Sequence, residues 1–247
     1  MTGFRASTAA AIVIGNELLS GKVEERNMLE LSRMLRELGI RFVRAVVIGD
    51  EVSVIRREVE ELSRTVDVVF TSGGVGPTHD DVTIEAVAQA FGVDCVVDPV
   101  LERLLKKVYG ESLTEAHLRM ALIPRGSELV SKSDAHWPAT LVRNVFVLPG
   151  VPEIFRMKLE SVRAYLTGAR PFVSQAAFVN LEEVDLKERL DAVVTRHPDV
   201  EVGSYPKWRD PSYRTKVTFD ARDRAAVERA LADFLALVES SLVVRVE

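Results

Sequence analysis

Short apolar runs rich in β-branched residues alternate with longer, helix-spaced apolar patterns in the first part of the chain. Three of these runs, at 8–14, 41–48 and 66–70, have the length and composition of buried strands in a parallel sheet. A helical pattern follows each of them. This repeated order predicts an α/β fold, a three-layer, open and mostly parallel sheet with helices on both faces.

The same alternation continues along the chain. Further strands are expected at 91–97, 128–130 and 144–148, and further helices at 99–110, 113–123 and 152–166. Pro124 is expected to stop the second of these helices, because proline cannot continue a helix. Cys95 falls in the strand at 91–97, where we expect a core thiol rather than a nucleophile.

The pattern changes after a linker at 167–171. Strands at 172–181, 200–203, 213–219 and 242–246 and helices at 184–196 and 224–239 follow in the order β-α-β-β-α-β. This order is typical of a split-βαβ, ferredoxin-like fold. We therefore expect two domains, a larger α/β domain at 1–168 and a small α+β domain at 169–247.

Composition narrows the classes of function. The formal net charge of −5 argues against binding to nucleic-acid phosphates, which requires a basic face. No apolar run reaches the roughly 18 residues of a membrane span, and the first residues lack the apolar core of a signal peptide. One cysteine excludes an internal disulfide framework and fits a reducing compartment. We expect a cytoplasmic protein without nucleic-acid or membrane partners.

The third predicted strand ends in a glycine-rich turn. Its residues are Thr71, Ser72, Gly73, Gly74, Val75, Gly76, Pro77 and Thr78. Glycine adopts positive φ and has no side chain to keep a ligand away from the backbone amides. A strand, a glycine turn and a helix N-terminus together present N–H groups and a positive dipole end to an anion. The turn therefore predicts a phosphate-binding site.

Two carboxylates, Asp80 and Asp81, follow in the same turn, and one of them is expected near the N-cap of the next helix. Both would repel a bare phosphate, so we expect a divalent cation to lie between carboxylate and phosphate and to bind both. The neighbouring His79 is either incidental to the turn or a base.

Loops after the other strands carry further polar groups. Glu17 follows the first strand, Asp50 the second, and Pro149 with Gly150 the strand at 144–148. Taken singly, Glu17 is consistent with a solvated acid, Asp50 with a helix cap, and Pro149-Gly150 with an architectural turn. Because loops at the carboxyl edge of parallel strands converge in space, their joint placement favours a ligand site.

The sequence offers no resident nucleophile. It contains no strand-elbow serine in triad order with a histidine and an acid, and no His-x-x-x-His or Cys-x-x-Cys spacing. An acid-rich, glycine-lined site of this kind suits phosphoryl or nucleotidyl chemistry. Asp50 and Asp81 are the favoured catalytic groups, as metal ligands or to orient water, and Asp80 is the second choice.

The segment 71–83, Thr-Ser-Gly-Gly-Val-Gly-Pro-Thr-His-Asp-Asp-Val-Thr, together with 47–51, resembles the hallmark of the MoaB/Mog, or molybdopterin-binding, domain family. Within that family the chain is most similar to the N-terminal domain of the competence/damage-inducible protein A (CinA) family and to the molybdopterin-binding-like domain of FAD synthases. The segments that carry this closer likeness are 15–21 with Asn27, 148–153 and 203–206.

The resemblance implies a fold of the kind predicted above and self-association into a homo-oligomer. It implies binding of a phosphorylated pterin or adenine dinucleotide and, in the two closer branches, divalent-metal-dependent hydrolysis of a pyrophosphate in ADP-ribose or FAD. The family's functional aspartates fall on Asp50 and Asp81. The ligand-binding residues that it implies are the turn from Thr71 to Thr78, with Glu17, Asn27, Pro149 and Gly150.

The chain departs from both branches. The damage-inducible branch carries Asn-x-x-Gly-Thr-Ala-Pro-Gly before the Leu-Pro-Gly turn, whereas 133–140 is Ser-Asp-Ala-His-Trp-Pro-Ala-Thr here. The C-terminal deamidase domain of that branch is missing. The adenylyl-transferring domain of FAD synthase is missing too, so we do not expect the chain to make FAD.

Three functions stay open from the sequence. The first is a metal-dependent nucleotide pyrophosphatase that hydrolyses an ADP-ribose- or FAD-like dinucleotide to AMP and a phosphorylated product. The second is pterin binding or adenylylation in molybdenum cofactor assembly, and the third is a non-catalytic nucleotide-binding module. The expected cofactor is a divalent metal such as Mg²⁺, with K⁺ as a further candidate; no haem is expected, and flavin enters as a substrate rather than a cofactor.

Overall fold

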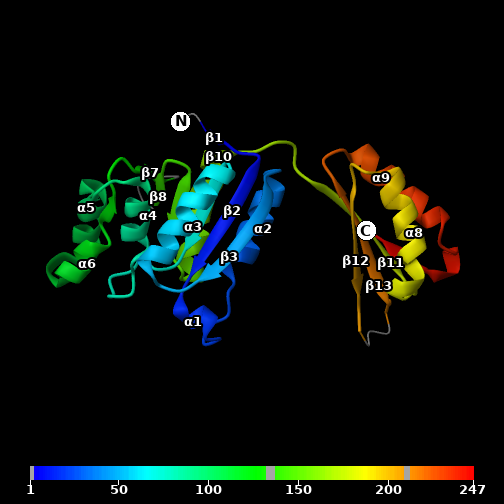
Figure 1. The fold of residues 1–247 in the computed structure, drawn as a ribbon, viewed down its shortest axis with the longest axis horizontal. Coiled ribbons are helices and arrows are strands. Elements are labelled where there is room, and N and C mark those ends of the chain that lie inside the picture. The colour runs from blue at the N-terminus through cyan, green and yellow to red at the C-terminus, as the bar shows by residue number, and fades with distance from the viewer. Residues whose placement is uncertain (1–2, 132–136, 209–211) are drawn as a thin grey trace. The chain divides into compact units, whose positions relative to one another are not determined.

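The computed structural model describes residues 3–131, 137–208 and 212–247. The chain divides into two compact units, Met1–Ala169 and Arg170–Glu247, named the first and the second unit here (Figure 1). Each unit has its own sheet and its own hydrophobic core. Within the described ranges, no helix combines the length and the apolar content that a membrane crossing requires. Of the segment 133–140, residues 133–136 lie outside the described ranges.

The first unit is built on a six-stranded sheet with the order β3-β2-β4-β9-β8-β7. Four of its strands are parallel neighbours: β3 (Arg41–Ile48), β2 (Thr8–Ile14), β4 (Val68–Ser72) and β9 (Val145–Leu148). The last two, β8 (Ala139–Val142) and β7 (Glu128–Val130), join in antiparallel orientation. The predicted mostly parallel α/β sheet is confirmed.

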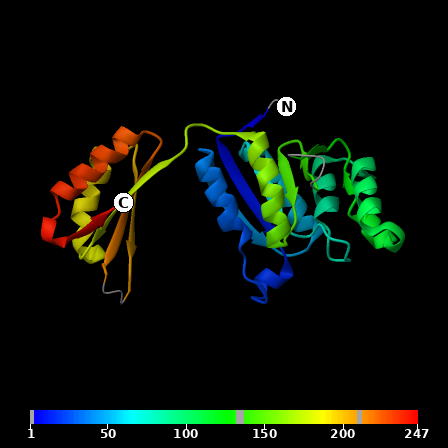
Figure 2. The ribbon, with the colours of Figure 1, turned by 180° about the vertical axis from the view of Figure 1, so that it is seen from behind.

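Helices cover both faces of this sheet, as the opposite views of Figures 1 and 2 show. The helices on one face are α2 (Asn27–Glu37) and α7 (Pro152–Tyr165), and those on the other are α3 (Val52–Thr65) and α4 (Thr83–Phe91). In β2, Ala9 and Ala11 pack with α2 and α7, whereas Ala10 and Ile12 pack with α3 and α4. Successive strand residues point to opposite faces, so an entirely apolar strand fits a sheet that is covered on both sides.

The helix predicted at 113–123 is confirmed only over five residues, and Pro124 ends a strand rather than this helix. The structure has instead η1 (Gly110–Ser112), α6 (Glu115–Arg119) and β6 (Leu122–Pro124). Thr114 caps α6 through a reciprocal pair of hydrogen bonds with His117. After α6, Ala121 and Ile123 pack against α5 (Pro99–Tyr109) in a separate small core, so tertiary packing overrides the helical spacing of the sequence.

Four further strands differ from the expectation. The strand predicted at 91–97 is shortened to β5 (Cys95–Val97), which pairs with β6 outside the central sheet. The sequence does not reveal β8, whose four residues are all buried but are too few to show a period. It also misses the short parallel pair β1 (Phe4–Arg5) and β10 (Leu166–Thr167). Cys95 is half-buried, and its burial raises the pKa of the thiol, consistent with a core role.

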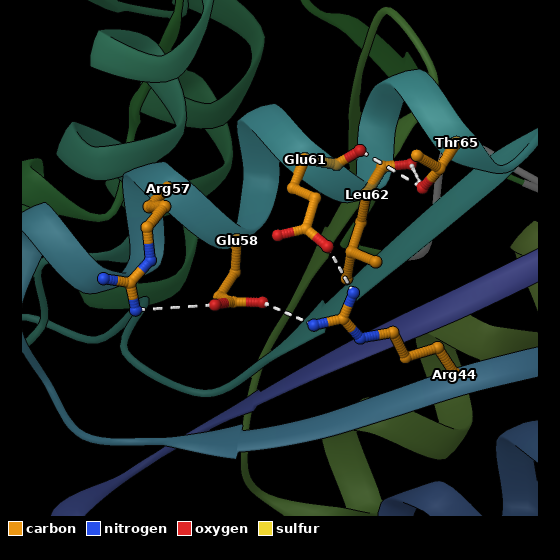
Figure 3. Close-up of polar contacts among 6 residues, drawn as sticks. All are labelled: Arg44, Arg57, Glu58, Glu61, Leu62 and Thr65. Carbon is orange, nitrogen blue, oxygen red and sulfur yellow. Dashed lines mark hydrogen bonds and ion pairs between the residues drawn. The ribbon is translucent and has the colours of Figure 1, made fainter.

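Charged side chains tie the edge strand β3 to α3 (Figure 3). Arg44 pairs with Glu61, and its guanidinium also lies 3.6 Å from the carboxylate of Glu58. Glu58 is buried and its Oε2 accepts no hydrogen bond in the described residues, so the ion pairs with Arg44 and Arg57 compensate its charge. The hydrogen bond with Glu61 raises the pKa of Arg44 and so favours its charged form.

The second unit confirms the predicted ferredoxin-like pattern. Its elements in chain order are β11 (Val173–Val179), α8 (Glu183–Arg196), β12 (Glu201–Pro206), β13 (Thr215–Ala221), α9 (Arg224–Ala236), η2 (Ser240–Leu242) and β14 (Val243–Val246). The strands form one antiparallel sheet in the order β12-β13-β11-β14. Both helices cover the same face of this sheet, over a core that includes Val217, Phe219 and Phe234 (Figure 1).

Candidate functional site

The candidate site lies at the carboxyl edge of the first unit's sheet. Because β3, β2, β4 and β9 are parallel, the loops that follow them all leave from this edge. The chain places β3 on one side of β2 and β4 on the other, so the strand order reverses at β2. Open α/β sheets bind ligands outside the carboxyl ends of the strands at such a reversal.

The glycine turn after β4 is held against the end of β2. Gly73 has φ 111°, and a Cβ there would lie 2.1 Å from the carbonyl oxygen of Ile14. Gly74 has φ 65°, and a Cβ there would lie 2.3 Å from Oγ1 of Thr83. Both the backbone conformation and the space therefore require glycine at these two positions.

The backbone amides of this turn divide into two groups. The N–H of Gly73 donates to the carbonyl of Leu148 at 3.1 Å, so it is part of the sheet and not open to a ligand. The N–H groups of Gly74, Val75 and Gly76 have no acceptor among the described residues, and all three residues are partly exposed. These three amides, rather than that of Gly73, are available to an anion.

The two carboxylates fold back onto the turn. The backbone N–H of Thr78 donates to Asp81 Oδ2 at 2.8 Å, and Thr78 Oγ1 lies 2.5 Å from the same oxygen. Thr78 Oγ1 also lies 2.6 Å from Asp80 Oδ1, and this hydrogen bond is the main cause that lowers the pKa of Asp80. A Cβ at Gly76 would lie 2.7 Å from Asp81 Oδ2, so this glycine makes room for the carboxylate.

The expected capping role of these aspartates is wrong. The helix α4 begins at Thr83, and the preceding residue, Val82, makes no side-chain cap. The buried hydroxyl of Thr83 instead donates to the carbonyl of Gly73 at 2.9 Å and ties the helix to the turn. Asp81 therefore stabilises the loop itself, in which four residues separate Thr78 from the start of the helix.

Asp50 joins the loops that follow β3 and β2. Its Oδ2 accepts a hydrogen bond from the backbone N–H of Asn16 at 2.8 Å, at the start of the short helix α1 (Asn16–Leu19). Glu51, not Asp50, precedes α3, so the alternative of a helix cap does not hold for Asp50. The carboxylate of Glu17 turns back toward Gly15, where a Cβ would lie 2.5 Å from Glu17 Oε1. The acids of these two loops thus face the strand ends.

Asn27 links the strand before the glycine turn to the Pro149–Gly150 turn. Its Nδ2 donates to Ser72 Oγ at 2.9 Å and to the carbonyl of Gly150 at 2.8 Å, and the side chain is buried. Gly150 lies against the turn, since a Cβ there would be 3.3 Å from the Cα of Gly73. Asn27, Ser72 and the Pro149–Gly150 turn therefore connect β4, β9 and α2, and they position the glycine turn instead of lining it.

The remaining predicted residues fall into two environments. Thr71 is completely buried, and its Oγ1 has no partner among the described residues, so it faces the core of the unit. The side chain of His79 is 98% exposed, and its Nδ1 lies 3.9 Å from Asp80 Oδ1. Pro77 is partly exposed and shapes the loop before Thr78.

A metal ion would find two carboxylates here and not a complete ligand set. Among the described residues, no group of three or more His, Cys, Asp or Glu side chains could hold a metal. Hydrogen bonds within those residues engage Oδ2 of Asp50 and Oδ2 of Asp81, and leave Oδ1 of each without a partner. Each of these free oxygens is of the kind that Mg²⁺ binds, since proteins hold this ion through one or two carboxylates together with phosphate oxygens of the ligand.

Sequence reasoning missed a buried lysine next to this edge. Lys158 of α7 donates its ammonium to the carbonyl of Pro138 at 2.7 Å, and burial lowers its pKa to about 7. Thr140 pairs with Val147 between β8 and β9, so Pro138 lies level with Pro149. One indication was present in the sequence: the lysine falls on the apolar face of its helix, beside Phe155, Leu159 and Val162.

A separate hollow of about 420 Å³ lies on the second unit. Its lining combines four acids with two arginines and three apolar residues: Phe172, Asp199, Glu201, Asp220, Ala221, Arg222, Asp223, Ala226 and Arg229. All of these residues belong to the second unit, and the four acids are unsuited to a phosphorylated ligand.

Comparison with known proteins agrees with this division of the chain. A family model described as "Probable molybdopterin binding domain" matches residues 10–167, and one described as "FAD synthase, middle domain" matches residues 171–247. A protein of Archaeoglobus fulgidus is 35% identical over 90% of this chain and 94% of its own length. A "Probable FAD synthase" of Caenorhabditis briggsae is 32% identical over 90% of this chain, which spans only 47% of that relative.

Among solved structures, the protein CinA from Thermoplasma acidophilum, of unknown function, is similar with a TM-score of 0.59 and 30% identity. The match covers 64% of this chain and 97% of that one. Both the resemblance that the motif at 71–83 predicts and its placement in an α/β domain are confirmed by these matches. The chain belongs to the MoaB/Mog-like molybdopterin-binding domain family.

Proposed function

We propose that the chain hydrolyses the phosphoanhydride bond of an adenine dinucleotide of the ADP-ribose or FAD kind, with a divalent cation, and releases AMP. One observation carries this proposal. The free amides of Gly74, Val75 and Gly76 share the sheet edge with two carboxylates, Asp50 and Asp81, that come from loops on opposite sides of β2. The site thus offers donors for phosphate oxygens and acids for water or a cation.

The residues divide the work of such a reaction. The three amides donate hydrogen bonds to the oxygens of one phosphate. These bonds offset the negative charge of the phosphate, which would otherwise repel an attacking water. Asp50 and Asp81 keep Oδ1 free to orient the water, whose oxygen bonds to phosphorus while the bridging P–O bond breaks. The water proton passes to a carboxylate, and AMP leaves with the other phosphorylated product. A bound cation would neutralise the charge that develops on the bridging oxygen.

The comparisons support an enzyme that acts on nucleotides without naming the reaction. Two of the relatives carry the name "Probable FAD synthase", and the chain matches about half the length of each. The whole activity of those proteins therefore does not transfer to this chain. The part that does match contains both the glycine turn and the second unit.

A second candidate is pterin binding or adenylylation, which the description of the matched family favours. A phosphorylated pterin would use the same amides for its phosphate. The purified protein distinguishes these functions. A hydrolase releases AMP, whereas a pterin-binding protein retains a fluorescent pterin. A non-catalytic nucleotide-binding module binds nucleotide without turnover.

The test is to incubate the protein with Mg²⁺ and either ADP-ribose or FAD, and to measure the AMP released by chromatography. Asp50→Asn and Asp81→Asn should each reduce the rate by roughly a hundredfold or more, because both lose the charge that positions water or cation. Asp94→Asn is the matched control, since Asp94 is exposed and distant in sequence from the site loops. Wild-type rates in both site variants, or no AMP with any divalent metal, would refute the assignment.

A further inference from the structure

The segment Gly203-Ser204-Tyr205-Pro206 forms the end of β12, the edge strand of the second unit's sheet. The structure of the second unit explains two of its residues, Ser204 and Pro206. Ser204 donates its hydroxyl to Glu183 of α8, on the helix-covered face of the sheet. Pro206 removes a backbone donor from an edge strand, which discourages pairing with another chain. Residues 203 and 205 lie on the opposite face of the sheet, which α8 and α9 do not cover.

Tyr205 lies along this open face, directly over Gly203. A Cβ at residue 203 would lie 2.9 Å from the Tyr205 hydroxyl oxygen and 3.0 Å from its ring. Any side chain at 203 would therefore lift the ring from the sheet. The tyrosine nevertheless remains 57% exposed, so the ring offers a flat aromatic surface instead of filling a core.

A buried hydroxyl without a partner lies next to this ring. Thr218 pairs with Gly203 across β12 and β13, and its Oγ1 would lie 3.1 Å from a Cβ at residue 203. The residue is 9% exposed, and Oγ1 makes no hydrogen bond in the described part of the chain. Folded proteins rarely leave such a group unsatisfied. Ala176, its partner on β11, is small and adds no bulk beside it.

Cations occupy one side of this platform and acids the other. The row with Tyr205 continues through Lys216, Phe178 and Arg245, with Arg245 3.7 Å and Lys216 5.5 Å from the centre of the Phe178 ring. Arg245 also contacts Glu247 at 2.7 Å. The row on the other side of Thr218 carries Glu201 and Asp220. An anionic group would therefore lie toward Lys216 and Arg245.

We propose that this open sheet face binds a mononucleotide, with its planar ring stacked on the exposed side of the Tyr205 ring. The phosphate lies at Lys216 and Arg245. Aromatic rings bind any base through its π-face, and guanidinium and ammonium groups bind phosphate. α8 and α9 cover only the other face, which leaves this one open within the second unit (Figure 1). This site is distinct from that of the proposed hydrolysis.

The test uses the full chain and FMN, whose own fluorescence is quenched when its ring stacks on tyrosine. Titration should show saturable quenching that AMP reverses and ribose 5-phosphate, which lacks a planar ring, does not. Tyr205→Leu should weaken FMN binding roughly tenfold or more, whereas Tyr205→Phe should retain it, because only the latter keeps the ring.

Asp81→Asn separates this site from the one in the first unit and should leave FMN binding unchanged. Thermal unfolding of each variant confirms that the second unit is folded. The proposal is overturned if FMN shows no saturable binding, if Tyr205→Leu binds like wild type, or if Asp81→Asn abolishes the quenching. Loss of AMP release with FMN binding intact would contradict the proposed hydrolysis alone.

Discussion

Replacing Lys158 by methionine tests how burial of this ammonium affects the stability of the first unit. The side chain is buried, and no carboxylate lies within ion-pair distance of it in the described residues; its one hydrogen bond goes to the carbonyl of Pro138. Burial lowers its pKa from 10.5 to about 7. Methionine has similar length and fills the same space without a charge.

The sign of the effect follows from proton binding. Between pH 7 and 10.5 the unfolded chain holds a proton on Lys158 that the folded chain has lost, so the free energy of unfolding rises with pH in this window. At about 1.4 kcal/mol for each pH unit, the gain is roughly 2 kcal/mol from pH 7 to 9 and roughly 5 kcal/mol over the whole window. Below pH 7 the destabilisation by the buried charge is fully present.

Lys158→Met should remove this dependence. At pH 6 the variant should be more stable than wild type, because it lacks the buried charge. Near pH 10 the remaining advantage, roughly 0.7 kcal/mol, is outweighed by the loss of about 1 kcal/mol that follows when the carbonyl of Pro138 loses its donor. The two curves of unfolding free energy against pH should therefore cross.

Urea unfolding between pH 6 and 10 measures both curves, in a Trp208→Phe background that leaves Trp137 to report on the first unit. Lys106→Met is the matched control, since Lys106 is exposed and pairs with Glu102 on the helix surface. Parallel curves for wild type and Lys158→Met would refute the reasoning. So would a wild-type curve that falls relative to the variant as the pH rises.

Three further substitutions test the support of the candidate site, each by urea unfolding. Gly73→Ala should lose roughly 3 kcal/mol, because φ is 111° and the new Cβ would meet the carbonyl of Ile14; Gly92→Ala, also at positive φ but with open space around it, should lose only about 1 kcal/mol. Asn27→Leu should lose about 2 kcal/mol, since it removes two hydrogen bonds and leaves the buried Ser72 Oγ without its donor, and an unchanged midpoint would contradict those bonds. Thr71→Val should gain roughly 1 kcal/mol by removing a buried hydroxyl without a partner, and a loss of stability would show that this hydroxyl has one.

The sequence predicts most of the fold because local pattern and tertiary environment agree along most of the chain. Apolar runs such as 8–14 can be buried only in a sheet that is covered on both faces. The prediction fails at the end of 113–123, where residues 122–124 pair as a strand with β5 instead of continuing the helix. It fails again for β8, whose residues become a strand only through pairing with β9. In both places a partner distant along the chain decides the structure.

The candidate site shows the same limit at the level of single groups. The motif correctly marks the turn, and both glycines at positive φ are recognisable from sequence. It does not reveal that the amide of Gly73 is used by Leu148, since that partner comes from another strand. The burial of Lys158 is likewise a property of the packing of α7 on β8 and not of its neighbours in sequence.

Residues within one motif therefore differ in what their substitution should change. Asn27 and Ser72 are buried and bonded to the protein, so their loss should lower stability and activity together. Asp50 and Asp81 each use one oxygen for a loop and keep the other free, so conversion to asparagine preserves the first contact and removes the charge. Their loss should lower activity with little change in stability. If all four variants instead kept wild-type stability and lost activity alike, the motif would act as a single ligand-contacting surface and the supporting role of Asn27 would be wrong.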